Sequence, residues 1–386
     1  MSGDIESIVR WLIDGARSAP KPQDVLAILC AGLLASGIPL SRAAVFVRTL
    51  HPNVAGRRFE WRSCEAVTIA EMPYGALEVA PFVDSPVPRV CVTGAALRCR
   101  LDTAPRLSDY PALATFVGEG VTDYWVTPLL FSNGEVHVAS WATREPDGFT
   151  DTQLRGIERV LAPFARIAEI HALRRTAINL LDAYVGHRSG ERILAGAIRR
   201  GDTEAIHAAI WLSDMRGFTA LADRLPSGEL IALLNRYFDC QITAIARHGG
   251  EVLKFIGDGL LAIFPIAENA PEVAAAALAA AQEASAAVPA IAATSAGEGV
   301  RFGLALHVGE VEYGNIGSEK RLDFTCIGPA VNLAARLEKL TGKLGRTIVA
   351  SSAFARLCPL PLQPLGEFRL AGFARSETVF TPTTGV

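Results

Sequence analysis

The spacing of hydrophobic and polar positions changes along the chain and divides it into segments. In the first segment, short apolar runs alternate with helical patterns, and residues 42–50 and 57–69 are each predicted to form a strand. Two further apolar runs flank an Asn-Gly pair, Asn133 and Gly134, which predicts a tight hairpin. Residues 1–164 are therefore expected to form a mixed α/β domain.

A long helix is expected after this domain. Thr150 can cap its start, and Gln153 stands where the partner in a capping box belongs. Pro163 should kink or break the helix. Its apolar residues recur mostly every three or four positions and form one stripe, namely Ile157, Val160, Phe164, Ile167, Ile170, Ala177, Leu181 and Val185. The stripe suits packing on its own domain or a parallel contact between two protomers, and we expect residues 165–205 to be a helical dimerising linker.

A compact α/β domain is predicted over residues 206–386. Its first apolar strand covers residues 208–213, with Asp214 at the end and a turn at Gly217 leading into a helix. A carboxylate beside a glycine turn leaves backbone open to a phosphate and the acid free to hold a cation. Taken alone, an aspartate in this place is more often a cap or turn residue.

Two strands meet next around Gly257, Asp258 and Gly259, which alone is an ordinary hairpin signal. Lys254 is less ordinary, because a lysine within an apolar strand needs a partner or a function. Asp214 and Asp258 together suggest a site for a hard cation. Mg²⁺ favours one or two carboxylates and completes its octahedron with water and phosphates.

Residues 301–328 predict a strand, a glycine-rich hairpin and a second strand, after which Pro329 starts a helix. Asn332 and Arg336 are four residues apart and share one face of this helix. The neighbouring face carries Leu333, Leu337 and Leu340, which should fix the helix to the core. Asn332 as a capping residue and Arg336 as a surface ion pair are the simpler readings of each residue alone.

Composition narrows the class of protein. A chain of 386 residues favours two domains, and a net charge of −3 gives no sign of binding to nucleic acid. The seven cysteines are scattered without metal-binding spacing, which predicts reduced thiols and a cytoplasmic protein. No signal peptide is expected, and the apolar stretches at 24–40 and 270–293 are too short or too interrupted to predict a membrane span.

Three motifs, DMRGFT, KFIGDG and LDFTCIGPAVNLAAR, follow one another in the C-terminal half. In this order they resemble the catalytic domain of class III nucleotidyl cyclases over roughly residues 205–384, and three ordered motifs are far more specific than one. The resemblance implies a ferredoxin-like βαββαβ palm and a head-to-tail homodimer with two active sites at the interface. It also implies two Mg²⁺ or Mn²⁺ ions at each site.

The resemblance also implies roles for individual residues. Asp214 and Asp258 match the metal-binding aspartates of one subunit, and Lys254, Asn332 and Arg336 match residues given by the other. Asn332 would orient the ribose, and Arg336 would stabilise the charge that builds up on the α-phosphate. Family members usually have one more basic residue near the C-terminus that contacts the triphosphate, and here Arg369 and Arg375 are both candidates.

The purine-reading position of the family lies seven residues before the helix asparagine. Counting back from Asn332 reaches Thr325 and not Asp323 or Cys326. Threonine there, with Lys254, resembles the class IIIb adenylyl cyclases. The chemistry agrees, because the hydroxyl can accept from N6 of adenine and the ammonium can donate to N1. Cys326 should point to the opposite face of its strand, into the core.

The sequence thus predicts an adenylyl cyclase that converts ATP to 3′,5′-cyclic AMP and pyrophosphate. The N-terminal half loosely resembles a GAF-type sensor domain, which would regulate the enzyme in response to a small molecule. Class IIIb members are often stimulated by bicarbonate, and Thr325 is the basis for expecting that here. The alternatives are a guanylyl or mixed-substrate cyclase, a catalytically silent partner that binds nucleotide, and an N-terminal half that is only a brace.

Overall fold

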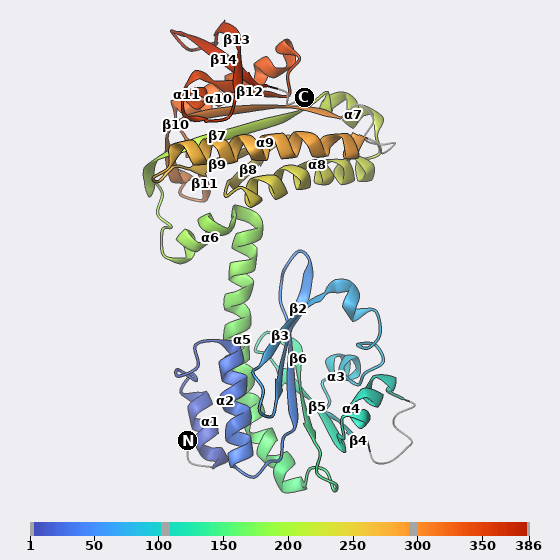
Figure 1. Cartoon of the computed structure of the whole chain (residues 1–386). Helices are drawn as coiled ribbons and strands as arrows, with labels where there is room; N and C mark the ends of the chain where they lie inside the picture. The colour runs from blue at the N-terminus through green and yellow to red at the C-terminus, as the bar shows by residue number, and fades with distance from the viewer. Residues whose placement is uncertain (1–3, 102–108, 293–299, 384–386) are drawn as a thin grey trace. The chain divides into compact units, whose positions relative to one another are not determined.

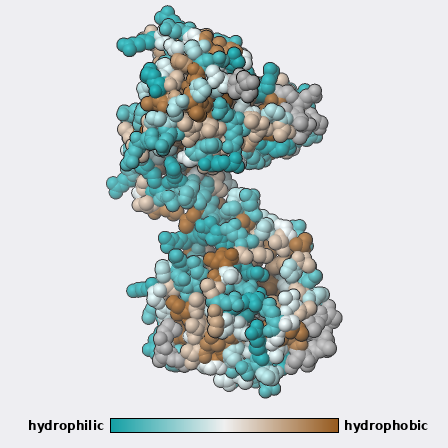
Figure 2. Space-filling view, in the orientation of Figure 1, coloured by the Kyte–Doolittle hydropathy of each residue, from teal (hydrophilic) through white to brown (hydrophobic). Residues whose placement is uncertain are grey.

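The computed structural model describes residues 4–101, 109–292 and 300–383. By its internal contacts the chain divides into two compact units, residues 1–183 and 184–386. The finer division at residues 164 and 205 stays a prediction. In the space-filling view hydrophilic side chains cover much of both units, and hydrophobic ones form scattered patches, as is usual for folded domains (Figure 2).

The N-terminal unit is built on one six-stranded sheet in the order β3-β2-β1-β6-β5-β4, in which every described pairing is antiparallel. The strands are β1 (Arg42–Arg48), β2 (Val54–Arg62), β3 (Thr68–Pro73), β4 (Leu97–Arg100), β5 (Asp123–Leu130) and β6 (Val136–Thr143). The predicted first strand and the β5–β6 hairpin are confirmed. The single strand predicted over 57–69 is wrong, because the chain turns at residues 63–67, where Cys64 has a φ of 67°.

Helices cover both faces of this sheet (Figure 1). One face packs against α1 (Ile5–Ile13), α2 (Pro22–Ala35) and the first half of α5 (Asp151–Val185). The other face carries α3 (Val87–Thr93), α4 (Ala114–Gly118) and the short 3₁₀ helices Tyr74–Leu77 and Pro111–Leu113. The sheet therefore has a hydrophobic core on each side.

Helix α5 begins as the sequence predicts. The backbone N–H of Thr150 donates to Oε1 of Gln153 at 2.9 Å, and the N–H of Gln153 donates to Oγ1 of Thr150 at 3.3 Å, which is a capping box. The helix does not break at Pro163 but continues to Val185. The first four residues of its apolar stripe, Ile157 to Ile167, are buried in the core of their own unit. For this part of the stripe, the predicted alternative of packing on the helix's own domain is confirmed.

The C-terminal unit begins with α6 (His187–Leu194) and contains an eight-stranded sheet, ordered β13-β14-β12-β10-β7-β9-β8 with β11 paired to β10. Its strands are β7 (Thr203–Arg216), β8 (Glu251–Ile256), β9 (Gly259–Pro265), β10 (Arg301–Ser318), β11 (Arg321–Ile327), β12 (Ile348–Ser351), β13 (Leu362–Arg369) and β14 (Ser376–Pro382). Its other helices are α7 (Phe218–Arg224), α8 (Ser227–Arg247), α9 (Ala270–Ala292), α10 (Pro329–Leu344) and α11 (Ser352–Leu357). The run β7-α8-β8-β9-α9-β10 with strand order β10-β7-β9-β8 is the predicted ferredoxin-like βαββαβ palm.

Two layers of helix bury the central strands. Helices α8 and α9 lie side by side over one face of the sheet (Figure 1), and α10 covers the other. Alternate residues of β7 enter the two cores, Ala209 and Trp211 on one side and Ala208 and Ile210 on the other. Burial on both faces explains why the strand reads as one continuous apolar run.

Helix α9 has the length and apolar composition of a membrane span over Ala270–Ile291. Its buried residues, among them Ala274, Leu278 and Ala281, belong to the core under α8. A core helix of a folded domain meets the same two criteria, so this feature is weak evidence for a membrane.

Candidate active site

Asp214 and Asp258 lie together at one end of the palm. Asp214 continues the series of β7 residues that faces α10, and Asp258 lies in the turn between β8 and β9, which pairs with β7. The two carboxyl groups are close enough to hydrogen-bond to each other. Burial, and then the charge of Asp258, raise the pKa of Asp214 to about 6.

A divalent cation would relieve this repulsion, and the pair fits Mg²⁺ or Mn²⁺. Gly259 lies so close that a Cβ there would be 3.1 Å from Oδ1 of Asp214, so this glycine keeps the space beside the carboxylate open. Within the described parts of the chain no third histidine, cysteine or acid completes a cluster. Mg²⁺ needs no more than two carboxylates when substrate phosphates and water supply its other ligands.

Glu338 is an acidic neighbour of this pair that the sequence analysis missed. Glu338 belongs to α10, and its side chain is buried on the side of that helix that faces the sheet. Burial and the charge of Asp214 raise the pKa of Glu338 to about 7. Its only signal in the sequence was an acid next to Leu337 on the face that packs against the sheet. Lys339 is also near enough to act on the pKa of Asp214.

Asn332 and Arg336 are exposed on α10, and neither makes a hydrogen bond or ion pair through its side chain with another described residue. The helix is held from its other side, where Leu337 is buried and Leu333 and Leu340 pack around it, as predicted. The amide and the guanidinium therefore do not contact the carboxylate pair within one chain. Two polar side chains presented side by side on a fixed helix are free to meet a ligand.

Thr325 and Cys326 lie on opposite faces of β11. Cys326 packs in the core with Phe324 and Tyr313, as predicted, and burial raises the pKa of its thiol to about 11. Thr325 is 2 % exposed, and its Oγ1 is a buried atom without a hydrogen-bond partner among the described residues. An orphaned hydroxyl of this kind costs about 1–3 kcal/mol, so a ligand that bonds it gains free energy. Because it is covered in the single chain, a neighbouring side chain must move before a purine can reach it.

Lys254 lies on β8, which runs beside β11. Its side chain is half-buried and makes no ion pair with another residue in the described ranges, and its charge partly opposes the rise in the pKa of Cys326. The structure therefore brings Lys254 and the segment around Thr325 to the same region of the sheet. Their roles in reading a purine stay predictions.

A buried polar cluster holds α6 on this same region, and it was also missed. Glu251, three residues before Lys254, accepts a hydrogen bond from Oγ of Ser189 at 2.8 Å and from the hydroxyl of Tyr313 at 3.1 Å. The guanidinium of Arg192 stacks 5.3 Å from the centre of the Tyr313 ring. The signal in the sequence for this cluster was Glu251, an acidic residue at the start of an apolar strand. The helix before the palm is thus bonded to the strand that carries Lys254.

The two candidate triphosphate residues both lie near the turn of the β13–β14 hairpin, where Arg369 pairs with Ser376 and Arg375 lies in the turn itself. Arg369 ends β13, whereas Arg375 lines a cavity of about 310 Å³ together with Leu333, the neighbour of Asn332 on α10. Both side chains are exposed. Arg375 is therefore close to the part of α10 that carries Leu333, whereas neither Asn332 nor Arg336 lines this cavity.

The sequence of this region matches known families. Residues 203–381 match the family described as the adenylate and guanylate cyclase catalytic domain. An uncharacterised protein of Mycobacterium tuberculosis is 30 % identical over 246 residues, which are 59 % of this chain and 44 % of that protein. Adenylate cyclase 1 of Rhizobium meliloti is 31 % identical over 175 residues, which are 44 % of this chain and 26 % of that protein.

Among solved structures, a bacterial light-regulated adenylyl cyclase has a TM-score of 0.50 at 23 % identity, covering 67 % of this chain and 85 % of that one. This likeness concerns the fold. The chain spans less than half the length of the curated relatives named here.

Proposed function

We propose that the protein is an adenylyl cyclase that forms 3′,5′-cyclic AMP and pyrophosphate from ATP, because residues 203–381 match the adenylate and guanylate cyclase catalytic domain family. In this reaction the 3′-oxygen of the ribose loses its proton and bonds to the α-phosphorus, and the bond from that phosphorus to the bridging oxygen of pyrophosphate breaks. The observation that carries the proposal is the pairing of Asp214 and Asp258 within that domain.

The two aspartates would hold the Mg²⁺ or Mn²⁺ ions. When bound, the metals would supply Lewis acidity to the 3′-hydroxyl and the triphosphate. The raised pKa of Asp214 supports this role, because burial and the charge of Asp258 both disfavour its ionised form, which a bound cation would stabilise. The pair of carboxylates therefore favours binding of a cation, and it does not favour a second proton donor.

Arg336 would stabilise the extra negative charge on the α-phosphate, and Asn332 would hold the ribose in line for attack. A guanidinium is charged at every physiological pH and presents a planar set of donors to phosphate oxygens. These roles are supported by the exposure of both side chains on α10, where neither has a hydrogen-bond or ion-pair partner among the described residues. Arg375 is the better candidate for the triphosphate, because it lines a cavity with the neighbouring residue Leu333.

Thr325 and Lys254 would select adenine. The orphaned Oγ1 of Thr325 can accept from the N6 amino group, and Lys254 can donate to N1. Guanine offers a carbonyl and an N–H at these positions, so a lysine matches it less well. A single hydroxyl discriminates less firmly than a carboxylate, and a guanylyl or mixed-substrate cyclase is the second candidate.

We propose a homodimer whose subunits each give half of every active site. Support comes from α5, where Ile170, Leu173, Ala177, Leu180 and Tyr184 are all exposed. Their spacings of three and four residues are those of a coiled-coil seam, on residues that follow the part of the helix buried in its own core. The same chain segment also leads into α6, which is bonded to β8 through Ser189 and Glu251.

The N-terminal unit would act as a GAF-type sensor. An antiparallel sheet covered by helices on both faces, followed by a long helix that precedes the catalytic domain in the chain, supports this assignment. Deletion of residues 1–150 tests it: a change in the regulation of turnover supports a sensor, and unchanged turnover and regulation would favour a brace. We propose a cytoplasmic location, because the scattered cysteines are typical of reduced thiols.

Turnover of ATP and GTP by one preparation, with Mg²⁺ and with Mn²⁺, tests the central proposal. Preferential formation of cyclic AMP is expected, and preference for GTP would overturn the purine assignment. Absence of both products from a dimeric protein would identify a silent partner.

Subunit complementation tests the shared site. Asp214→Ala and Arg336→Ala are each expected to be inactive, and mixing them should restore roughly a quarter of the wild-type rate, since half the dimers are mixed and each has one intact site. Mixing Asp214→Ala with Asp258→Ala is the matched control, because both lesions remove the same half and no mixed dimer has an intact site. Failure of the first mixture to recover, although the two chains pair, would refute the arrangement.

A further inference from the structure

A cavity of about 450 Å³ lies in the N-terminal unit, between α2, α5 and the edge of the sheet formed by β1, β2 and β3. Its size is within the range of about 300–1,000 Å³ that small-molecule sites occupy. The cavity lies on the face of the sheet that carries α2 and α5, whereas the candidate catalytic residues all belong to the other unit.

The floor of this cavity is apolar. Val45 and Val47 of β1, Phe59 of β2, and Phe164 and Ile167 of α5 supply it. Side chains of this kind favour a ligand with an apolar body, because binding removes the apolar surface of both partners from water.

The rim is basic. Lys21, Arg57, Arg174 and Arg175 line the cavity, and no acidic side chain does so among the described residues. Arg57 is paired with Glu71 at 2.5 Å, but the other three make no ion pair that involves described residues. Burial and the charge of Arg174 lower the pKa of His171 on the same rim, so its imidazole is neutral near pH 7 and adds a neutral polar group.

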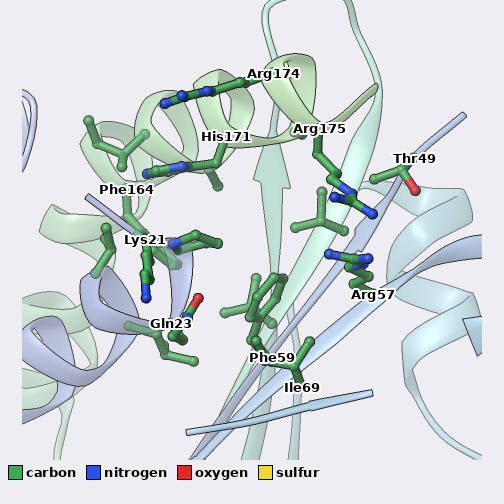
Figure 3. A pocket seen from close by; sticks show the side chains of 18 of the residues that line it. Lys21, Gln23, Thr49, Arg57, Phe59, Ile69, Phe164, His171, Arg174 and Arg175 are labelled. Atoms are coloured by element: carbon green, nitrogen blue, oxygen red, sulfur yellow. The ribbon is translucent and has the colours of Figure 1, made fainter. Parts of the chain in front are cut away.

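Arg175 is the best-placed cation. Its Nε is buried without a hydrogen-bond partner among the described residues, which is a cost that an anionic ligand would remove. Figure 3 shows Arg175 from α5 and Arg57 from β2 directed toward the same side of the cavity, beside Thr49, while Lys21 lies on the other side near Gln23. The head group of a ligand would therefore be held near Arg175 and Arg57, with its body over Phe59.

We propose that this cavity binds an organic anion that has an apolar body and a single carboxylate head group. A second copy of the chain is the competing occupant of an apolar hollow. A symmetric contact would set this basic rim against itself, and like charges directly opposed are unfavourable, so the charge pattern favours an anion.

Calorimetric titration of the full-length chain tests the proposal with three probes that share a ten-carbon tail: decanoate, decan-1-ol and decyltrimethylammonium, each below its micelle concentration. Decanoate is expected to bind one site per chain, about tenfold or more tighter than decan-1-ol, because a charge-assisted hydrogen bond is worth about 1.5–3 kcal/mol. 1-Naphthoate serves as an aromatic arm that distinguishes an aliphatic from an aromatic body. Equal binding of the acid, the alcohol and the ammonium would mean adsorption to apolar surface and would overturn the proposal, as would no binding of either carboxylate.

Variants separate charge from shape. Arg175→Gln should weaken decanoate about tenfold or more and leave decan-1-ol unchanged. Ala168→Phe, which adds bulk to the α5 wall without changing charge, should weaken both. Arg155→Gln, at an exposed arginine on the same helix outside the cavity, is the matched control and should bind like the wild type. Unchanged decanoate affinity in Arg175→Gln would refute the site. The site would also be refuted if Ala168→Phe lost the dimer but still bound decanoate, because that result identifies a second copy of the chain as the occupant.

Discussion

The repulsion between Asp214 and Asp258 predicts that losing a catalytic group will stabilise the metal-free protein. Asparagine at position 214 keeps an oxygen that can accept from the backbone N–H of Met215 and a side chain that can hydrogen-bond to Asp258, but it removes the charge. We therefore expect Asp214→Asn to abolish cyclase activity and to raise stability above about pH 6 in the absence of divalent metal.

The magnitude follows from the pKa of Asp214, which rises from 3.8 to about 6 in the fold. About two pKa units at about 1.4 kcal/mol each correspond to about 3 kcal/mol. The Asp214 side chain is only partly buried and keeps contact with solvent, so screening by water reduces this to about 1 kcal/mol. Between pH 3.8 and 6 the folded state binds more protons than the unfolded state, so this group's contribution to stability falls as pH rises through that window. The gain from the variant should be absent below pH 4 and complete above pH 6.

Scanning calorimetry of the full-length chain in EDTA, at pH 4.5 and pH 8, measures this effect. For a unit of this size about 1 kcal/mol corresponds to a rise of roughly 2–4 °C in the transition of the catalytic unit. Added Mg²⁺ should stabilise the wild type and leave the variant unchanged, so that the difference shrinks or reverses. Asp239→Asn on α8, at an exposed aspartate that makes no side-chain hydrogen bond or ion pair with a described residue, is the control and should match the wild type. A variant that is equally or less stable than the wild type at pH 8 in EDTA would refute the reasoning.

Four further tests have clear expected outcomes. Tyr313→Phe removes the hydroxyl that donates to buried Glu251, and we expect the unfolding free energy to fall by about 1.5–3 kcal/mol in urea denaturation. An unfolding free energy equal to that of the wild type would mean that this cluster does not hold α6. Arg375→Ala should raise KM for ATP about tenfold in steady-state kinetics while Arg369→Ala stays near the wild type, and the reverse order would reassign the triphosphate contact. Thr325→Val should lower the ratio of ATP to GTP turnover several-fold, whereas an unchanged ratio would remove this residue from purine selection. Bicarbonate added at constant pH is expected to increase the turnover of purified protein, and no increase would remove the class IIIb expectation.

Local signals in the sequence predicted a large part of the fold. The capping box at Thr150 and Gln153, the hairpin at Asn133 and Gly134, and the start of α10 after Gly328 were all predicted correctly, because each depends on a few consecutive residues. The single strand over residues 57–69 was predicted wrongly. Nothing in its alternating pattern marks the turn at residues 63–67, which the pairing of β2 with β3 imposes.

The candidate site also has features that local sequence determined and features that depend on the fold. The sequence alone determined which residue types stand in the three motifs and the register that selects Thr325 over Asp323 and Cys326, because strand and helix periods are local properties of the backbone. The alternation held: Cys326 is in the core, and Thr325 lies on the other face.

Only the tertiary structure decided which polar and charged side chains are in contact. Asp214 and Asp258 are 44 residues apart, and Ser189 and Glu251 are 62 apart, yet each pair is in contact. Burial and the nearby charge of Asp258 set the pKa of Asp214. Packing also leaves Oγ1 of Thr325 without a hydrogen-bond partner within the described part of the chain. Both results depend on strands that are far apart in the sequence. A sequence specifies the side chains a site can use, but the fold sets the dielectric surroundings and distances that make them a pair.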